Sequence, residues 1–180
     1  ELSNGNILIT AYEFNGSQPG GVIATFSGDF ESLIDYHLVP ETNFEWYINN
    51  DNIILDSQDN FIISSNIRWN SDYRNYITSG DSEFNNVVNT ELFFSHEVAL
   101  TEIIENSNGN IVACGYTIEN NDHDFFFTEF DKNGNIILEK KFENFDGEQI
   151  ASSIKQLDDN SYIILGNHQT LDIVEVFKID

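Results

Sequence analysis

Basic residues are scarce in this chain. Its 180 residues include 7 Lys and Arg against 31 Asp and Glu, which gives a formal net charge of -24 at pH 7. Such a surface repels a phosphate backbone and has few cations to replace its counterions, so the composition argues against nucleic acid as a partner. The acidity suits solubility in a salty or extracellular medium. Acidic loops for a divalent cation or for a basic partner are the alternatives.

Cysteine and long apolar runs are also lacking. The single cysteine, Cys114, cannot form an internal disulfide, and its place in the apolar run Ile111–Gly115 predicts a small core residue. A reactive thiol is the alternative, but no basic residue is close in sequence to lower its pKa. No stretch approaches the ~18–20 apolar residues that cross a bilayer, and no basic segment precedes an apolar one at the N-terminus. We expect no membrane insertion.

Recognisable catalytic motifs are missing too. There is no Gly-x-Ser-x-Gly elbow, no Gly-rich phosphate loop and no assignable Ser-His-Asp set. The histidines lack a metal-binding spacing and are expected at the surface; they are His37, His96, His123 and His168. Only Arg68 and Arg74 could serve a sialidase-like carboxylate site. We expect no enzyme, with no catalytic, cofactor-binding or metal-binding residues and no cofactor.

What the sequence does contain is an internal repeat. One phrase occurs four times, at Asn6–Tyr12, Asn60–Asn66, Asn110–Tyr116 and Ser161–Asn167. The spacings from Ile7 to Phe61, Ile111 and Tyr162 are 54, 50 and 51 residues. A second phrase keeps this period, since Phe125–Asp131 matches Val174–Asp180. A regular period points to repeated structural units.

The clearest unit, residues 99–148, predicts four strands. Its runs of β-branched and aromatic residues are Leu100–Glu105, Asn110–Thr117, Phe125–Phe130 and Asn135–Phe142. Asn108-Gly109 and Asn133-Gly134 suit tight hairpin turns, which predicts antiparallel pairing. No sustained 3.6-residue apolar period favours a helix. The predicted fold class is all-β.

A repeat of about 50 residues forming one four-stranded antiparallel sheet is typical of a β-propeller blade. Face-to-face packing of blades would bury both faces of each sheet, which explains the unbroken apolar runs Phe125–Phe127 and Ile163–Leu165. A β-solenoid, whose repeats are shorter, and a β-sandwich, which has no reason to repeat, are the rivals.

The repeated phrases resemble the β-propeller repeats of secreted and surface-anchored bacterial proteins, and more distantly kelch-type blades. The resemblance covers residues 99–180 well and residues 13–98 poorly. Ile136–Leu138 stands where those repeats have a Trp, and Asn160-Ser161 replaces their Gly-Gly. The resemblance implies the fold and a location outside the cell or on a bacterial surface, but no reaction.

We expect residues 1–180 to form one repeat domain, an arc of about four blades within a larger propeller. Blade 1 covers about 1–40, blade 2 about 45–95, blade 3 about 98–147 and blade 4 about 149–180. In kelch-like order the innermost strand precedes the repeated phrase. Blade 1 would then lack its innermost strand and blade 4 its outermost, with complete blades at Ile53–Leu92 and Leu100–Phe142. Further chain, a protein partner or a second copy would cover the terminal blades.

Two groups of residues could form binding surfaces. Asn120–Asp124 is the most oxygen-rich loop, and whether its acidic residues Asp122 and Asp124 bind calcium is open. Trp46 and Trp69, with three neighbouring tyrosines, would fill an irregular core between blades or stack on a sugar. The similar run Asp131–Asn135 is better explained as a hairpin turn.

Taken together, these features predict a non-catalytic, extracellular or cell-surface scaffold for protein or glycan interaction. Its mechanism would be the presentation of loops on a rigid frame. A lectin-like carbohydrate-binding module is the alternative. A glycan-active hydrolase that uses some of the many carboxylates is the third possibility.

Overall fold

The computed structural model describes residues 2–14, 19–39, 45–47, 52–69, 72–119, 122–143, 147–168 and 173–179. These residues form 15 β-strands and contain no helix, so the predicted all-β class is confirmed. Within them there is accordingly no helix long and apolar enough to cross a membrane.

The strands form four antiparallel sheets, each from one continuous stretch of chain. Sheet 1 contains β1 (Ile7–Phe14), β2 (Pro19–Phe26) and β3 (Leu33–Val39). Sheet 2 contains β4 (Glu45–Tyr47), β5 (Ile53–Leu55), β6 (Phe61–Trp69), β7 (Asp72–Gly80) and β8 (Val88–Leu92). Sheet 3 contains β9 (Val98–Glu105), β10 (Ile111–Thr117), β11 (Phe125–Phe130) and β12 (Ile136–Phe142). Sheet 4 contains β13 (Gln149–Gln156), β14 (Tyr162–His168) and β15 (Ile173–Ile179).

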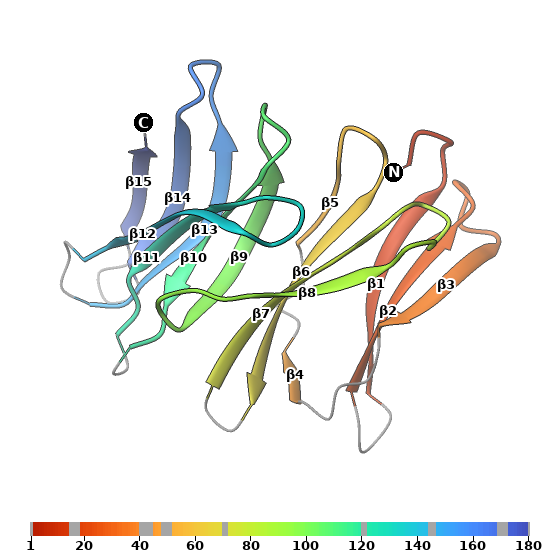
Figure 1. Cartoon of the computed structure of the whole chain (residues 1–180), viewed down its shortest axis with the longest axis horizontal. Coiled ribbons are helices and arrows are strands. Elements are labelled where there is room, and N and C mark those ends of the chain that lie inside the picture. The colour runs from red at the N-terminus through yellow and green to blue at the C-terminus, as the bar shows by residue number, and fades with distance from the viewer. Residues whose placement is uncertain are drawn as a thin grey trace.

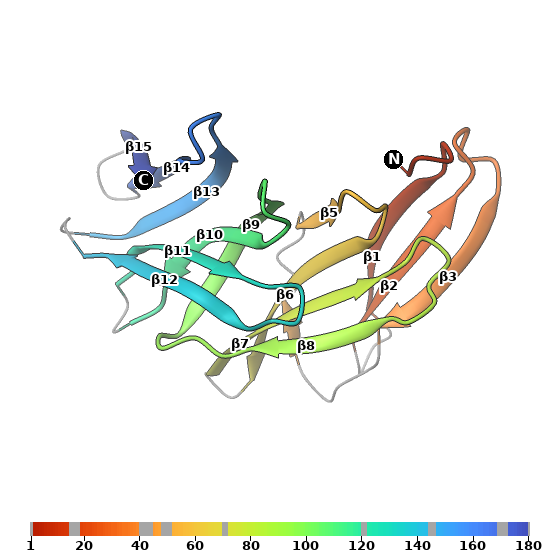
Figure 2. The ribbon, with the colours of Figure 1, turned by 45° about the horizontal axis from the view of Figure 1, so that its top comes forward.

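The four sheets follow one another in chain order. Figure 1 shows them side by side, from red β1–β3 at one end to blue β13–β15 at the other, and Figure 2 shows the same order after rotation. Contacts between sheets concentrate on their first strands: β9 lies against β5, β6 and β7 of sheet 2 and against β13 of sheet 4. The repeat in the sequence is therefore a repeat of sheets in space.

The four strands predicted for residues 99–148 are confirmed as β9–β12, within two residues at each end. The four strands expected over Ile53–Leu92 are confirmed as β5–β8, and β4 adds a fifth strand to sheet 2. Both β4 and β5 pair with β6, through Glu45 opposite Arg68 and Ile53 opposite Ile63. β4 and β5 therefore lie along the same edge of β6.

One type of turn recurs before the repeated phrase, and also before β8 and β12. In the turn Asp56–Asn60, the Asp56 N–H donates to the Asn60 carbonyl and the Asp59 N–H donates to the Asp56 carbonyl. The fourth residue of such a turn has a positive φ, which glycine and asparagine adopt at low cost. These residues are Gly5, Asp59, Phe84, Gly109, Gly134 and Asn160. The hairpin turns predicted at Asn108-Gly109 and Asn133-Gly134 are confirmed.

Alternation along the strands sorts side chains onto two faces of each sheet. We call the face toward the following sheet the forward face and the face toward the preceding sheet the backward face. In β10, Ile111 and Ala113 face backward into a core with sheet 2, whereas Val112 and Cys114 face forward into a core with sheet 4. The unbroken run Phe125–Phe127 divides in the same way and is at most 1% exposed. Sheet 3 is therefore buried on both faces, as the sequence predicts.

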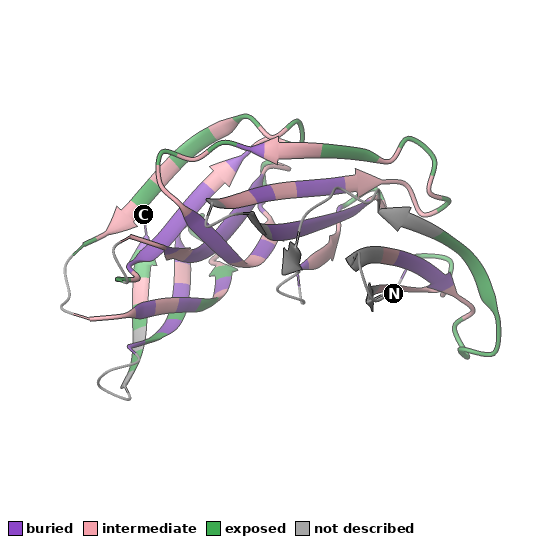
Figure 3. Cartoon of the chain, turned by 90° about the horizontal axis from the view of Figure 1, so that it is seen from below, coloured by how far each residue is buried: buried purple, intermediate pink, exposed green. Residues whose placement is uncertain are grey.

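The outer faces of the first and last sheets are different. Figure 3 shows buried purple residues concentrated in the central strands and exposed green residues along the outer ones. In β14, Ile164 is 1% exposed but its neighbour Leu165 is 41% exposed. The expected burial of all of Ile163–Leu165 is therefore wrong, because among the described residues nothing covers the forward face of sheet 4.

Polar side chains tie sheet 2 to the first strand of sheet 3, and sheet 3 to the first strand of sheet 4. The Asn66 amide donates to the Leu100 carbonyl (2.7 Å) and accepts from the Leu100 N–H (2.9 Å), and Asn75 donates to the Val98 carbonyl. Thr101 donates to the Ala151 carbonyl at 2.7 Å in sheet 4. Strands β9 and β13 are sheet edges, so these bonds satisfy backbone groups that have no partner strand.

Replacement of Gly115 by Ala is expected to destabilise the fold. Gly115 lies at a bulge where β10 approaches β9 so closely that a Cβ would overlap the Ala99 carbonyl oxygen. Because a backbone atom cannot move aside cheaply, we expect a loss of about 2–3 kcal/mol in unfolding free energy, measured by urea denaturation.

The control is Gly109→Ala. Its Cβ would meet only the end of the Glu105 side chain, at 3.9 Å, but its φ is +80°. The strain of a positive φ alone is expected to cost about 1–2 kcal/mol. A Gly115→Ala protein as stable as the wild type would contradict the close approach.

Candidate functional site

One end of all four sheets is formed by turns, which we call the turn rim. It consists of residues 2–6, 27–32, 56–60, 81–86, 106–110, 131–135 and 157–161. These segments carry nine acidic side chains and one basic one, Lys132. The acidic residues are Asp29, Glu31, Asp56, Asp59, Asp81, Glu83, Asp131, Asp158 and Asp159. The turn rim is therefore strongly acidic.

The turns are held by their own side chains. The Asp56, Asp81 and Asp131 carboxylates each accept hydrogen bonds from the N–H groups two and four residues later, at 2.8–3.0 Å. The Asn106 side-chain oxygen makes the same pair of bonds. An acceptor at the first position fixes the backbone of the whole turn. The rim is thus a row of similar, well-constrained loops.

Adjacent turns are also bonded across the sheets. The Ser3 N–H donates to Asp59 (3.2 Å), the Ser57 N–H to Glu105 (2.8 Å) and the Ser107 N–H to Gln156 (2.9 Å). Each bond links one sheet to the next, and the three donors stand at equivalent places in the repeat. These bonds keep neighbouring turns in a fixed spacing along the rim.

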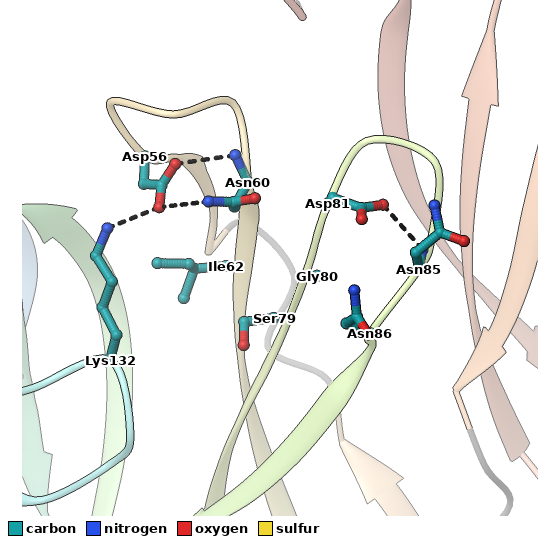
Figure 4. Close-up of a pocket in the computed structure, with 9 residues that line it drawn as sticks. All are labelled: Asp56, Asn60, Ile62, Ser79, Gly80, Asp81, Asn85, Asn86 and Lys132. Atoms are coloured by element: carbon teal, nitrogen blue, oxygen red, sulfur yellow. Dashed lines mark hydrogen bonds and ion pairs between the residues drawn. The ribbon is translucent and has the colours of Figure 1, made fainter.

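A pocket of about 200 Å³ lies on the rim between sheets 2 and 3. Figure 4 shows Asp56 and Asn60 on one turn, Asp81 and Asn85 on another, and Lys132 reaching Asp56 from the sheet 3 side. The Lys132 Nζ lies 2.7 Å from Asp56 and 2.9 Å from Glu105. The pocket is therefore lined by carboxylates and amides, with a single ammonium group already paired.

The two carboxylates of the pocket are engaged by donors. Burial opposes ionisation of Asp56, but hydrogen bonds from Lys132 and from the side chain and N–H of Asn60 outweigh it and lower its pKa to about 2. Glycoside hydrolysis by a carboxyl pair needs one carboxyl whose pKa is raised, so that it keeps a proton. The pKa of Asp56 is instead lowered. The pocket is better suited to contact a cation than to donate a proton.

Three histidine side chains are described, and one prediction about them is wrong. His168 was expected at the surface, yet it is 2% exposed. Side chains alternate between the two faces of a strand, so His168 lies on the backward face of β14 together with Tyr162 and Ile164. Those two residues pack on sheet 3, and His168 therefore lies in the same interface. His96 binds Glu119 at 2.7 Å, and the His123 ring lies 4.8 Å from the Tyr116 ring. The side chain of His37 is outside the described residues.

The oxygen-rich loop is described only from Asp122 to Asp124, since Asn120 and Asn121 lie outside the described residues. Its Asp124 carboxylate is 3.1 Å from the Lys141 Nζ, which also contacts Glu119 at 2.9 Å. Burial lowers the pKa of Lys141, but its interactions with these two carboxylates outweigh burial, so the net pKa is raised and the side chain stays charged. This ammonium occupies the place that a cation would take beside Asp124.

The remaining candidates are core residues or lie beyond the described side chains. Cys114 is fully buried, and desolvation raises the pKa of its thiol to about 12, as expected for a small core residue. Tyr76 packs in the core between sheets 1 and 2, as the core interpretation of these aromatics predicts. The side chains of Trp46 and Trp69 are outside the described residues, although their backbones form parts of β4 and β6.

Comparison with known proteins identifies no family for this chain. No protein-family model matches the chain, and a search of curated proteins finds no match. Among the described residues, no three His, Cys, Asp or Glu side chains are grouped so that they could hold a metal ion.

Replacement of Lys132 by Met is expected to change the acid limb of the stability curve. The pKa of Asp56 is lowered in the folded state, so its contribution is complete above the unfolded pKa of about 3.9 and is lost as pH falls towards about 2. Without the ammonium that pKa rises. At neutral pH we expect the unfolding free energy of the variant to be about 1–3 kcal/mol lower than that of the wild type. Between about pH 4 and pH 2 the unfolding free energy should fall less steeply in the variant than in the wild type.

Urea denaturation across this pH range provides the measurement, and Lys178→Met is the matched control. Lys178 also contacts an aspartate, Asp159, but both side chains are about half exposed. Removal of such an exposed pair is expected to change the unfolding free energy very little. Equal effects of the two substitutions would contradict the special role of Lys132.

Native Cys114 is expected to resist thiol reagents. Because the side chain is buried and its pKa is raised to about 12, almost no thiolate is present or reachable near neutral pH. Colorimetric titration should find one thiol per chain in denaturant and none in the folded protein over the same period. Rapid labelling of the folded protein would contradict this position in the core.

Proposed function

We propose that this chain is an arc of a β-propeller that serves as a non-catalytic scaffold outside the cell or on a bacterial cell surface. In this proposal the acidic turn rim binds a protein partner through a basic surface on that partner. The scaffold acts by presentation: its sheets hold the turns in place, and the turns make the contacts.

The arrangement of the sheets supports the propeller part of the proposal. Four antiparallel sheets are stacked face to face in chain order, and they contact each other mainly through their first strands. In a propeller the first strands gather near the axis and the last strands diverge. A repeat of about 50 residues with one sheet in each unit has the same origin.

The charge of the turn rim carries the binding part of the proposal. The rim segments carry nine carboxylates and one ammonium, Lys132, which is paired with Asp56 and Glu105, while Lys178 of β15 pairs with Asp159. Glu31, Glu83 and Asp158 are exposed there. A rigid surface that carries charge of one sign attracts and orients a partner that carries the opposite charge. The absence of a basic patch in these turns makes an acidic partner a poor fit.

Neutralisation of the rim tests this proposal. The probe is a lysine-rich peptide, with binding measured by calorimetry at low salt and at ~0.3 M salt. The rim variant combines Glu31→Gln, Glu83→Gln and Asp158→Asn. We expect it to bind at least about five-fold more weakly than the wild type at low salt, and binding by the wild type to weaken strongly as salt rises.

The matched control removes the same three charges at the opposite end of the sheets, by Asp122→Asn, Glu143→Gln and Glu148→Gln. A response governed by net charge alone would weaken binding equally in both triple variants and would contradict a site on the rim. Salt-insensitive binding on a glycan array that is lost in Trp69→Ala would instead favour the lectin-like alternative. Turnover of a glycoside substrate would favour the hydrolase.

A further inference from the structure

The forward face of sheet 4 is apolar and uncovered in the described part of the chain. Leu165, Val174 and Val176 are 41%, 71% and 64% exposed. In the repeat, Val174 and Val176 stand where sheet 3 has Phe125 and Phe127. Those two phenylalanines are at most 1% exposed, because sheet 4 covers them. The forward face of sheet 4 therefore has the character of one half of a sheet–sheet interface.

The backward face of sheet 1 has the character of the other half. The repeat places Ile7 where Phe61 and Ile111 stand, and both of these are fully buried against the preceding sheet. The pairing register puts Ile7 and Phe26 on this face together with Leu33, which is 53% exposed. It also puts Tyr36 there, which is 57% exposed. Sheet 1 thus presents the surface on which a preceding sheet would pack.

We propose that the forward face of sheet 4 packs on the backward face of sheet 1 of a second copy of this chain. The contact would continue the interface that joins sheet 1 to 2, sheet 2 to 3 and sheet 3 to 4. The inference uses the stacked sheets of the proposed scaffold but does not depend on what the turn rim binds.

Charge favours this head-to-tail contact over like-to-like contacts. By register, Lys155 and Lys178 lie on the forward face of sheet 4, on either side of Ile163. Residues 2–39, the part of the sequence that includes sheet 1, contain four acidic residues and no Lys or Arg. A contact between two copies of sheet 4 would bring lysines together, and one between two copies of sheet 1 would bring acidic segments together. The mixed contact instead brings lysines towards a segment that is acidic.

The geometry of the arc points to a closed pair. A head-to-tail contact is heterologous, and it ends only when the rotation between copies closes a ring. Two copies of the four described sheets give eight, within the range of about four to eight blades that close a propeller. Both uncovered faces of both copies would then be buried.

Sedimentation at ~0.1 mM protein measures the association. The wild type is expected to have twice the monomer mass of 20.6 kDa. Val176→Glu places a charge on the sheet 4 face, and Leu33→Glu places one on the sheet 1 face. Each variant alone is expected to be monomeric, because every contact in the ring needs one face of each kind.

A mixture of the two variants provides the decisive comparison. It leaves one intact sheet 4 face, on the Leu33→Glu chain, and one intact sheet 1 face, on the Val176→Glu chain. A heterodimer joined by one contact is therefore expected in the mixture only. Val88→Glu is the control, because Val88 is 53% exposed but lies on β8 of sheet 2, and this variant should remain dimeric.

A monomeric wild type, a dimer that persists in either single variant, or a mixture that stays monomeric would overturn the proposal. The last two results would indicate like-to-like contacts or a covering segment of another kind. Circular dichroism checks the folding of each variant, and Val174→Glu with Tyr36→Glu gives a second pair on the same two faces. None of these substitutions alters the turn rim, so peptide binding there reports separately on the proposed function.

Discussion

The packing of one apolar sheet face on the next is the interaction on which the rest of the structure depends. Side chains alternate along a strand, so a strand between two sheets must be apolar at almost every position. β10 and β11 meet this requirement, with Ile111, Val112, Phe126 and Phe127 all at most 1% exposed. Burial of such side chains contributes about 1.5–3 kcal/mol each. No single sheet could obtain this burial alone.

The polar bonds of the molecule follow from that stacking. Once β9 and β13 lie as edges against a preceding sheet, their backbone groups need partners, which Asn66, Asn75 and Thr101 provide. At the turn rim, backbone N–H groups of one turn bind side chains of the next sheet in the same manner. The apolar interfaces supply most of the stability, and these directional bonds fix how the sheets are aligned.

The sequence was informative about local structure and much less so about the rim. The repeat phrase and the Asn-Gly turns predicted β9–β12 and their pairing, because those signals act within a few residues. The contact of Lys132 with Asp56 joins residues 76 positions apart, and no local pattern marks it. A regular signal was nonetheless present: Asp or Asn opens most of these turns, with Asn four residues later at Asn60, Asn110 and Asn135. An alignment of these turn sequences would have predicted that the acidic residues lie together on the turn rim.

What the sequence by itself determined is the all-β class, the strands and the turn conformations, since β-branched runs and residues that accept a positive φ act locally. It also determined the large negative charge. Only the tertiary structure decided which face of each sheet is covered. His168 is buried because sheet 3 lies against its face, whereas Leu165, three residues earlier, is exposed because the described residues provide no sheet for its face. Burial depends on a neighbour that is distant in sequence, and hydrophobicity alone does not identify that neighbour.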